Sequence, residues 1–237
     1  VGENLSLANE RISEGTPETM REREVSGLTV VLAENPAAGR TLPRPLTHGL
    51  PDEAFLRGKT PMTKLEVRSV SLSKLALTEN AVVYDVGAGT GSVSVECARL
   101  SSGIRVFSIE RDPEALELLE KNRQQFSLSN MEIVAGTAPE ALEGLPAPTH
   151  VFIGGSGGSM DRIVDTVLRK NGTARFVVNL ITPESLAAVM DLPRVLPVTD
   201  PEIVMVTAAR SKKAGNSHLM LGANPVWIVA FSGREDQ

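Results

Sequence analysis

A three-glycine turn between two apolar segments is the feature that most constrains how this chain folds. Residues 82–91 read Val-Val-Tyr-Asp-Val-Gly-Ala-Gly-Thr-Gly. A helix-like segment, 92–100, leads to a second apolar run that ends on Glu110. A strand, a glycine turn, a helix and a second strand ending on an acid form a unit that binds nucleosides. We therefore expect a parallel sheet with a ligand site at the carboxyl end of its first strand.

The glycine spacing indicates which nucleoside is expected. A dinucleotide fingerprint, G-x-G-x-x-G, needs its third glycine at position 92, where this chain has Ser92. The observed G-x-G-x-G spacing favours S-adenosylmethionine over NAD. Glu110 is expected to accept hydrogen bonds from both ribose hydroxyls. The predicted binding turn comprises Asp85, Gly87, Ala88, Gly89, Thr90 and Gly91.

Strand-like and helix-like segments alternate along the chain after residue 62. The expected strands are 81–86, 104–109, 131–135, 150–153, 174–179, 202–209 and 226–231, and the expected helices are 63–76, 92–100, 113–126, 139–142, 160–170 and 183–190. Such alternation predicts a parallel sheet with helices on both faces. The last two strands have no helix between them, so they are expected to pair antiparallel. The predicted α/β fold is a Rossmann-like, doubly wound sheet of seven strands with a terminal antiparallel hairpin, the class I S-adenosylmethionine-dependent methyltransferase architecture.

The chain is expected to contain a main domain over residues 62–233. Residues 1–34 carry a possible helix at 17–24 and a strand-like run at 28–32, and they are too few to bury a sizeable core. Prolines and glycines crowd residues 35–61, which predicts a linker. Thr63 is expected to cap the first helix of the main domain, with Glu66 completing a capping box.

Composition narrows the class of protein. The formal net charge of −5 gives no overall attraction to nucleic acid, and no apolar run is long enough to span a bilayer. The single cysteine, Cys97, excludes an internal disulfide and fits the cytoplasm, and it is expected to be a buried structural thiol. His48, His150 and His218 are scattered, so no metal site is expected.

Two further segments follow expected strands and complete the predicted site. Gly136, Thr137 and Ala138 follow the third strand, where backbone groups are expected beside an adenine. The run Gly154-Gly155-Ser156-Gly157-Gly158 follows the fourth strand, beside the position where a methyl group would be delivered. Its small residues leave room for a bulky acceptor, and the N-P-P-Y motif of many methyltransferases that act on nucleic-acid amines is missing.

Several segments together resemble the precorrin-6B C15-methyltransferase (decarboxylating) family of cobalamin biosynthesis. The resemblance spans roughly residues 49–231 and is carried by residues 49–55, 61–68, 85–91, 138–142, 152–158 and 224–226. Residues 1–34 resemble the end of the tetrapyrrole methylase domain that precedes the C15 domain in bifunctional members. We therefore expect residues 1–34 to be a remnant of that preceding domain.

The resemblance implies methyl transfer to C15 of a precorrin, a tetrapyrrole, with loss of CO₂ from the C12 acetate. It implies cofactor contacts at Thr63, Gly87 to Gly91, Glu110 and Ala138, and assembly as a homo-oligomer. It assigns no catalytic residue. A carboxylate-rich substrate calls for basic groups near the cleft. The candidates are Arg57, Lys59, Lys64, Lys212, Lys213 and His218.

Other functions stay open at this point. The glycine turn and the strand order would equally serve a methyltransferase that acts on RNA or protein. The acidic balance and the missing N-P-P-Y-like motif count against that alternative. A non-catalytic domain that binds S-adenosylmethionine is the third hypothesis, and a NAD-dependent oxidoreductase is the least favoured.

Overall fold

The chain divides into two units, Val1–Arg44 and Pro45–Gln237, and the computed structural model describes residues 1–34 and 47–234. In the first unit, strands β1 (Gly2–Glu3), β2 (Arg11–Ile12) and β3 (Thr29–Val30) form an antiparallel sheet, with a short helix α1 (Pro17–Met20). The predicted helix 17–24 and strand 28–32 were therefore too long. Leu28, Val31 and Leu32 are exposed, so little apolar burial supports longer elements.

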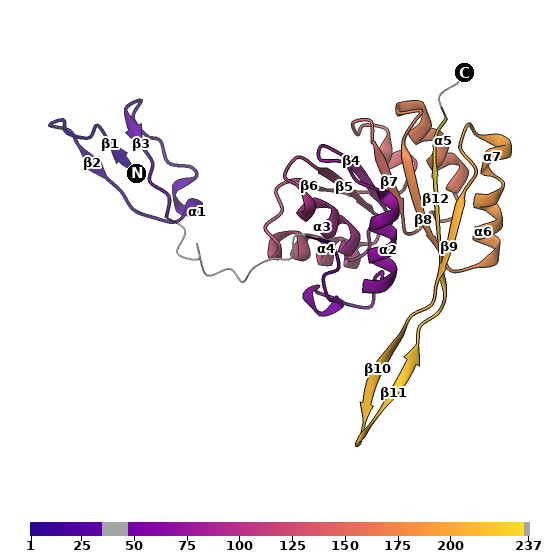
Figure 1. Ribbon diagram of the computed structural model, residues 1–237. Coiled ribbons are helices and arrows are strands. Elements are labelled where there is room, and N and C mark those ends of the chain that lie inside the picture. Colours follow the sequence, from indigo (N-terminus) through magenta and orange to yellow (C-terminus); the bar gives the residue numbers. More distant parts are fainter. Residues whose placement is uncertain (35–46, 235–237) are drawn as a thin grey trace. The chain divides into compact units, whose positions relative to one another are not determined.

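The second unit contains a seven-stranded sheet in the order β6-β5-β4-β7-β8-β12-β9 (Figure 1). Its strands are β4 (Val82–Val86), β5 (Arg105–Glu110), β6 (Met131–Ala135), β7 (His150–Ile153), β8 (Arg175–Leu180), β9 (Glu202–Val206) and β12 (Val226–Ser232). Strands β4 to β8 pair parallel, and β12 pairs antiparallel with both β8 and β9. The predicted doubly wound, seven-stranded α/β sheet is confirmed. Its direction of winding reverses beside β4, which is where ligands bind in such sheets.

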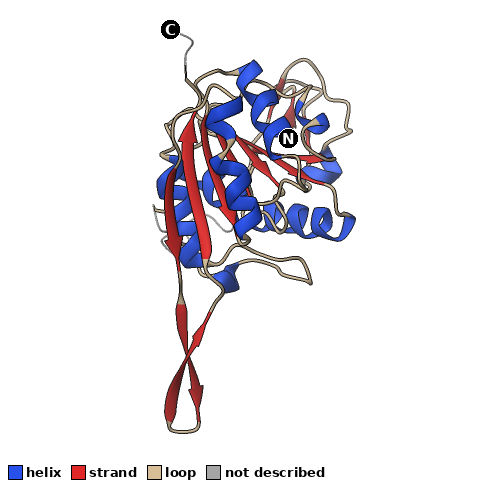
Figure 2. Cartoon of the chain, turned by 90° about the vertical axis from the view of Figure 1, so that its right-hand side faces the viewer, coloured by secondary structure: helices blue, strands red, loops and turns tan. Residues whose placement is uncertain are grey.

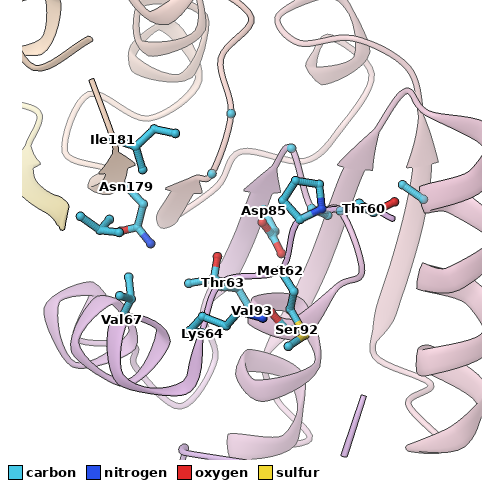
Figure 3. Close-up of a pocket in the computed structure, with 18 of the residues that line it drawn as sticks. Thr60, Met62, Thr63, Lys64, Val67, Asp85, Ser92, Val93, Asn179 and Ile181 are labelled. Carbon is cyan, nitrogen blue, oxygen red and sulfur yellow. The ribbon is translucent and has the colours of Figure 1, made fainter. Parts of the chain in front are cut away.

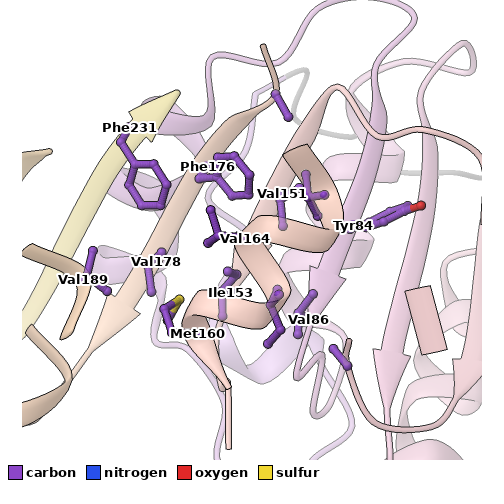
Figure 4. Packing of buried hydrophobic residues seen from close by; sticks show 14 of the residues in the cluster. Tyr84, Val86, Val151, Ile153, Met160, Val164, Phe176, Val178, Val189 and Phe231 are labelled. Atoms are coloured by element: carbon purple, nitrogen blue, oxygen red, sulfur yellow. The ribbon is translucent and has the colours of Figure 1, made fainter. Parts of the chain in front are cut away.

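Helices cover both faces of the sheet. Helices α2 (Leu65–Leu75), α3 (Ser92–Leu100) and α4 (Pro113–Gln125) contribute to the core on one face, and α5 (Met160–Lys170), α6 (Pro183–Met190) and α7 (Leu192–Val195) to the core on the other. Figure 4 shows the second core, where the rings of Phe176 and Phe231 stack with centroids 4.9 Å apart. Cys97 is buried in the first core, as predicted. No described helix is long and apolar enough to cross a membrane.

A second hairpin lies between the two antiparallel strands β9 and β12. Strands β10 (Ala209–Ala214) and β11 (Ser217–Gly222) pair with each other and extend beyond the end of the sheet (Figure 2). The predicted strand 202–209 was therefore wrong at its end, because β9 stops at Val206 and residue 209 belongs to the new ribbon. All residues of β10 and β11 are exposed, so no buried face marked them in the sequence.

The start of α2 differs from the prediction. The helix begins at Leu65, its N-cap is Lys64 without a side-chain cap, and it ends at Leu75. The predicted capping box of Thr63 and Glu66 is wrong, because Asp52 accepts the hydrogen bond from the Leu65 N–H at 3.0 Å. Asp52 lies in a short 3-10 turn, η1 (Asp52–Ala54). A carboxylate from an earlier segment therefore replaces the local cap.

Residues 47–61, the described part of the predicted linker, hold the turn η1 and several buried side chains. Leu50 and Phe55 are buried in the same core as α2 and α3. Residues 35–46 of that predicted linker lie outside the described residues. The short helix expected at 139–142 is a 3-10 turn, η2 (Glu140–Leu142).

Candidate cofactor and substrate site

The turn between β4 and α3 packs tightly against the loop that follows β7. Gly87 has a φ of +73°, a conformation that side chains disfavour. A Cβ at Gly87 would lie 2.9 Å from the backbone nitrogen of Gly155 and 3.0 Å from its oxygen. Both neighbours are backbone atoms, so the turn and the loop after β7 approach this closely only because residue 87 is glycine.

Glu110, at the end of β5, is held in place by backbone donors. Its Oε2 accepts from the Gly89 N–H at 2.9 Å, and its Oε1 accepts from the Arg111 and Asp112 N–H groups at 2.8 and 2.9 Å. Because a carboxylate oxygen can accept two hydrogen bonds and Oε2 accepts only one here within the described residues, the group retains capacity for a hydroxyl donor. The glycine turn and the end of β5 are thereby joined through one carboxylate.

Asp85, at the end of β4, is a buried carboxylate with one satisfied and one unsatisfied oxygen. Its Oδ2 accepts from the Ser94 N–H at 3.0 Å and from the Ser94 hydroxyl at 2.5 Å. The Ser108 hydroxyl in turn donates to Ser94 at 2.7 Å. Asp85 Oδ1 has no partner within the described residues, and burial raises the pKa of this carboxyl to about 6. A positively charged or donor group of a ligand would satisfy it.

Gly87, Asp85 and Glu110 line a cavity of about 1100 Å³ at the carboxyl ends of the parallel strands. Figure 3 shows Asp85 facing it, with Thr63, Ser92 and Val93 nearby. The predicted site residues that line it are Thr63, Asp85, Gly87, Ala88, Gly89, Glu110, Gly136, Thr137 and Ala138. Thr90 and Gly91 are not among the lining residues, and Thr90 is buried beneath the turn. The volume exceeds that of a typical single-ligand pocket, so it has room for two molecules.

The lining also includes residues that sequence reasoning missed. Asn179, near the end of β8, lies across the cavity from Asp85 (Figure 3). Its Oδ1 accepts from the Ser71 hydroxyl at 2.9 Å, and its Nδ2 has no partner in the described parts of the chain. A polar residue that ends an apolar strand at the carboxyl edge was the available signal. Residues from the base of the hairpin, which was not predicted, complete the lining: Ala208, Arg210, Ser211, Lys212, Leu221, Gly222, Ala223 and Asn224.

The predicted basic groups divide into two sets. Lys59, Lys64 and Lys212 line the cavity, and their amines form no hydrogen bond or ion pair with another described residue. The other three candidates, Arg57, Lys213 and His218, are not among the lining residues, which corrects that part of the prediction. Lys213 and His218 are paired in register on the hairpin beyond its base.

Known proteins resemble this chain in sequence and fold. A family profile described as a precorrin methyltransferase domain matches residues 53–231. The chain belongs to the precorrin methyltransferase family. A probable cobalt-precorrin-6B C(15)-methyltransferase (decarboxylating) from Pyrobaculum calidifontis is 40% identical over 186 residues, which cover 77% of this chain and 95% of the relative.

Two more relatives agree with this family assignment. The cobalt-precorrin-6B C(15)-methyltransferase (decarboxylating) of Salmonella typhimurium is 37% identical over 187 residues, covering 78% of this chain and 96% of the relative. The crystal structure of a precorrin-6y C5,15-methyltransferase from Geobacter metallireducens has a TM-score of 0.74 and 35% identity, covering 80% of this chain and all of that one. The class I methyltransferase fold of this precorrin methyltransferase is thus confirmed.

Proposed function

We propose that this chain transfers a methyl group from S-adenosylmethionine to C15 of a precorrin and releases the carboxyl carbon of the C12 acetate as CO₂. The observation that carries the proposal is one continuous cavity. Its lining includes a nucleoside-binding turn, with Asp85 and Glu110, and also Asn179 and the base of the hairpin. That combination supports a cofactor and a large acceptor bound side by side.

The residues present fit S-adenosylmethionine. Its amino group is positively charged, and the unsatisfied Oδ1 of Asp85 is a buried acceptor at the cavity. Its ribose hydroxyls are donors, and Glu110 is a carboxylate already oriented by three backbone N–H groups. When bound, this cofactor supplies a methyl group on a positively charged sulfur, which is a good leaving group. The chain's task is therefore to position the two reactants rather than to activate a nucleophile.

The proposed decarboxylation also depends on the substrate. As the bond between the acetate methylene and its carboxylate breaks, CO₂ leaves and the electron pair passes into the conjugated macrocycle. The pair then returns to the methylene carbon as that carbon takes a proton from water, which leaves a methyl group on C12. The macrocycle acts as the electron sink, as organic cofactors do in other enzymes. The carboxylates that remain would be held by Lys59, Lys64 and Lys212, which line the cavity. The unpaired amide group of Asn179, Nδ2, offers a further hydrogen-bond donor to the precorrin.

The test is incubation of the purified protein with labelled S-adenosylmethionine and precorrin-6B or its cobalt form, followed by mass analysis. The proposal expects a product that has gained one methyl group and lost CO₂. A methyl gain without CO₂ loss would contradict the coupled reaction. No transfer to either precorrin, with transfer to RNA or protein instead, would favour the alternative methyltransferase. Cofactor binding without any transfer would favour the non-catalytic domain.

The first unit and the assembly state are separate proposals. From the sequence resemblance, we propose that residues 1–34 belong to the end of a tetrapyrrole methylase domain. The exposure of Leu28, Val31 and Leu32, at 61%, 69% and 79%, is consistent with an apolar surface that packs against such a domain. Homo-oligomerisation and a cytoplasmic location are proposed from the family resemblance. Sedimentation of the full chain would measure the first, and cell fractionation the second.

A further inference from the structure

Beyond the backbone that joins it to β9 and β12, the hairpin β10–β11 is bonded to the rest of its unit, within the described residues, through one polar side chain. All residues of the two strands are exposed, and their backbone pairing is with each other. Within the described chain, every hydrogen bond and ion pair from residues 209–222 to another element comes from Arg210. The position of the ribbon therefore depends on what Arg210 contacts.

Arg210 binds two carboxylates from two different segments. Its Nε and Nη2 donate to the two oxygens of Glu66, in the first turn of α2, at 2.9 and 2.6 Å. Its Nη1 donates to Asp52 Oδ2 at 2.8 Å. This bidentate geometry is one that arginine makes and lysine does not. Because two carboxylates already surround its guanidinium, Arg210 is a poor site for a third anion, and a direct contact with a substrate carboxylate is disfavoured.

The partner Asp52 belongs to a buried network that reaches the cavity. Its Oδ1 accepts from the Leu65 N–H at 3.0 Å and from Arg68 Nη1 at 3.3 Å. Arg68 is fully buried, and it donates to Glu96 Oε1 of α3 at 2.9 Å and to the Thr63 carbonyl at 2.6 Å. Thr63 lines the cavity. Through Arg210 and Asp52, the hairpin is therefore connected to a buried network of hydrogen bonds that joins η1, α2 and α3.

The base of the hairpin is also part of the cavity wall. Ala208, Ser211, Lys212 and residues 221–224 line the cavity together with Arg210 itself. The proposed cofactor anchors Asp85 and Glu110 come from β4 and β5, and their hydrogen-bond partners among the described residues lie outside the ribbon. A substitution that lets the hairpin move would therefore alter the part of the cavity wall that is proposed to contact the precorrin. It would leave Asp85 and Glu110, the proposed cofactor anchors, in place.

We propose that Arg210 is a positioning residue that holds the hairpin base against α2 and η1 as the wall that receives the precorrin. The proposal rests on the proposed function, since it concerns the acceptor end of the same cavity. It assigns specificity for the precorrin to the ion pairs of Arg210 with Asp52 and Glu66, which act by fixing the position of the wall rather than by binding a substrate carboxylate. Binding of S-adenosylmethionine at the other end of the cavity is expected not to depend on Arg210.

The experiment compares Arg210→Gln, Arg210→Lys and Glu66→Gln with the wild-type chain. The matched control is Arg194→Gln, which removes an exposed pair with Asp191 on α7. Backbone hydrogen exchange of residues 209–222 and calorimetry with S-adenosylmethionine alone are measured first, and then KM and kcat with precorrin-6B. Glu66→Gln is included because Glu66 is partly exposed and its loss leaves Asp52 paired with Arg210 and Arg68.

For Arg210→Gln we expect faster exchange across the hairpin, an unchanged dissociation constant for S-adenosylmethionine, and a KM for the precorrin raised about tenfold at little changed kcat. Glu66→Gln should shift the same quantities less, Arg210→Lys should restore part of the KM, and Arg194→Gln should match wild type. Unchanged exchange, or faster exchange with unchanged KM, would overturn the proposal. If wild type transfers no methyl group to a precorrin, the proposed function fails, while the exchange results still report whether Arg210 holds the ribbon.

Discussion

At the scale of single residues, the buried charge of Asp85 is expected to favour cofactor binding and to lower the stability of the cofactor-free chain. Burial raises its pKa to about 6, from an ordinary value of 3.8. The folded state therefore loses stability as pH rises from about 4 through about 6, and at pH 8 the buried charge costs about 3 kcal/mol.

Asp85→Asn removes that charge, and the cofactor-free chain is expected to gain about 1–2 kcal/mol of unfolding free energy at pH 8, less than the full cost because the new amide brings two buried N–H donors to the unpartnered position. The affinity for S-adenosylmethionine should fall about tenfold, because the amide gives its ammonium group no charge. Denaturant unfolding at pH 5 and pH 8 and calorimetry measure both quantities. A variant that is less stable than wild type at pH 8 would contradict the pKa argument.

Gly87, in the turn after β4, and Gly155, in the loop after β7, lie against each other and provide a test variant and its control. Gly87→Ala combines a left-handed φ with a Cβ 2.9 Å from backbone, whereas a Cβ at Gly155 meets nothing within 4 Å. We expect Gly87→Ala to lower the unfolding free energy by about 2–4 kcal/mol and to abolish measurable cofactor binding. Gly155→Ala should change stability by less than about 1 kcal/mol. Thermal unfolding distinguishes the pair, and equal losses would show that steric contact at Gly87 is not the cause.

At the scale of elements, α2 depends on a residue outside itself. Asp52 accepts from the first helical N–H and pairs with the buried Arg68 and with Arg210. Burial pushes the Asp52 pKa up, but the hydrogen bond and charge of Arg210, together with Arg68, hold it below its ordinary value. This contribution to stability is therefore present above about pH 4 and is lost as pH falls through the lowered pKa.

Asp52→Asn is expected to destabilise the chain by about 2–4 kcal/mol at pH 7, because Arg68 loses one of its two buried carboxylate partners. The matched control Asp191→Asn removes an exposed partner of Arg194 and should cost less than about 1 kcal/mol. The measurement is denaturant unfolding at pH 7 and again near pH 3. The difference between wild type and Asp52→Asn should shrink at the lower pH, and a difference that grows there would refute the assigned role.

The same residues explain what the sequence could predict and what it could not. Asp85 and Glu110 lie in the last residues of β4 and β5, at the carboxyl edge of the sheet, so the hydrophobic pattern and the order of the strands were enough to predict that they share one site. The start of α2 was mispredicted because its acceptor, Asp52, lies 13 residues away, and no local pattern marks that contact. Arg68 carries no signal either, since an arginine in a helix is ordinarily exposed.

The hairpin β10–β11 was missed for another reason. Its residues have no buried face, so periodicity gave no strand signal, although Gly215 and Asn216 between two six-residue runs are typical of a tight hairpin turn. Gly215 has the positive φ, +60°, that such a turn requires. Local turn chemistry, rather than hydrophobic pattern, was the available signal.

At the scale of the whole molecule, the proposed reaction requires an acidic chain to bind a substrate with many carboxylates. The formal net charge is −5, yet Lys59, Lys64 and Lys212 line the cavity. Long-range repulsion by the molecule and local attraction by these lysines are both screened by salt, but the lysines act at the shorter range. Association of the precorrin is therefore expected to depend on the lysines at low ionic strength.

Raising the salt concentration from about 0.02 M to about 0.5 M should raise the KM for the precorrin several-fold while the dissociation constant for S-adenosylmethionine changes little, because Debye screening weakens attraction between separated charges most. The double variant Lys64→Glu/Lys212→Glu should have a raised KM at low salt and should lose this salt dependence. Lys121→Glu serves as the control, because Lys121 lies on α4 outside the cavity lining. Steady-state kinetics at several salt concentrations measures the slopes. If the double variant keeps the wild-type KM at low salt, the precorrin is not held by these lysines, and the acceptor is steered by other groups at the cavity.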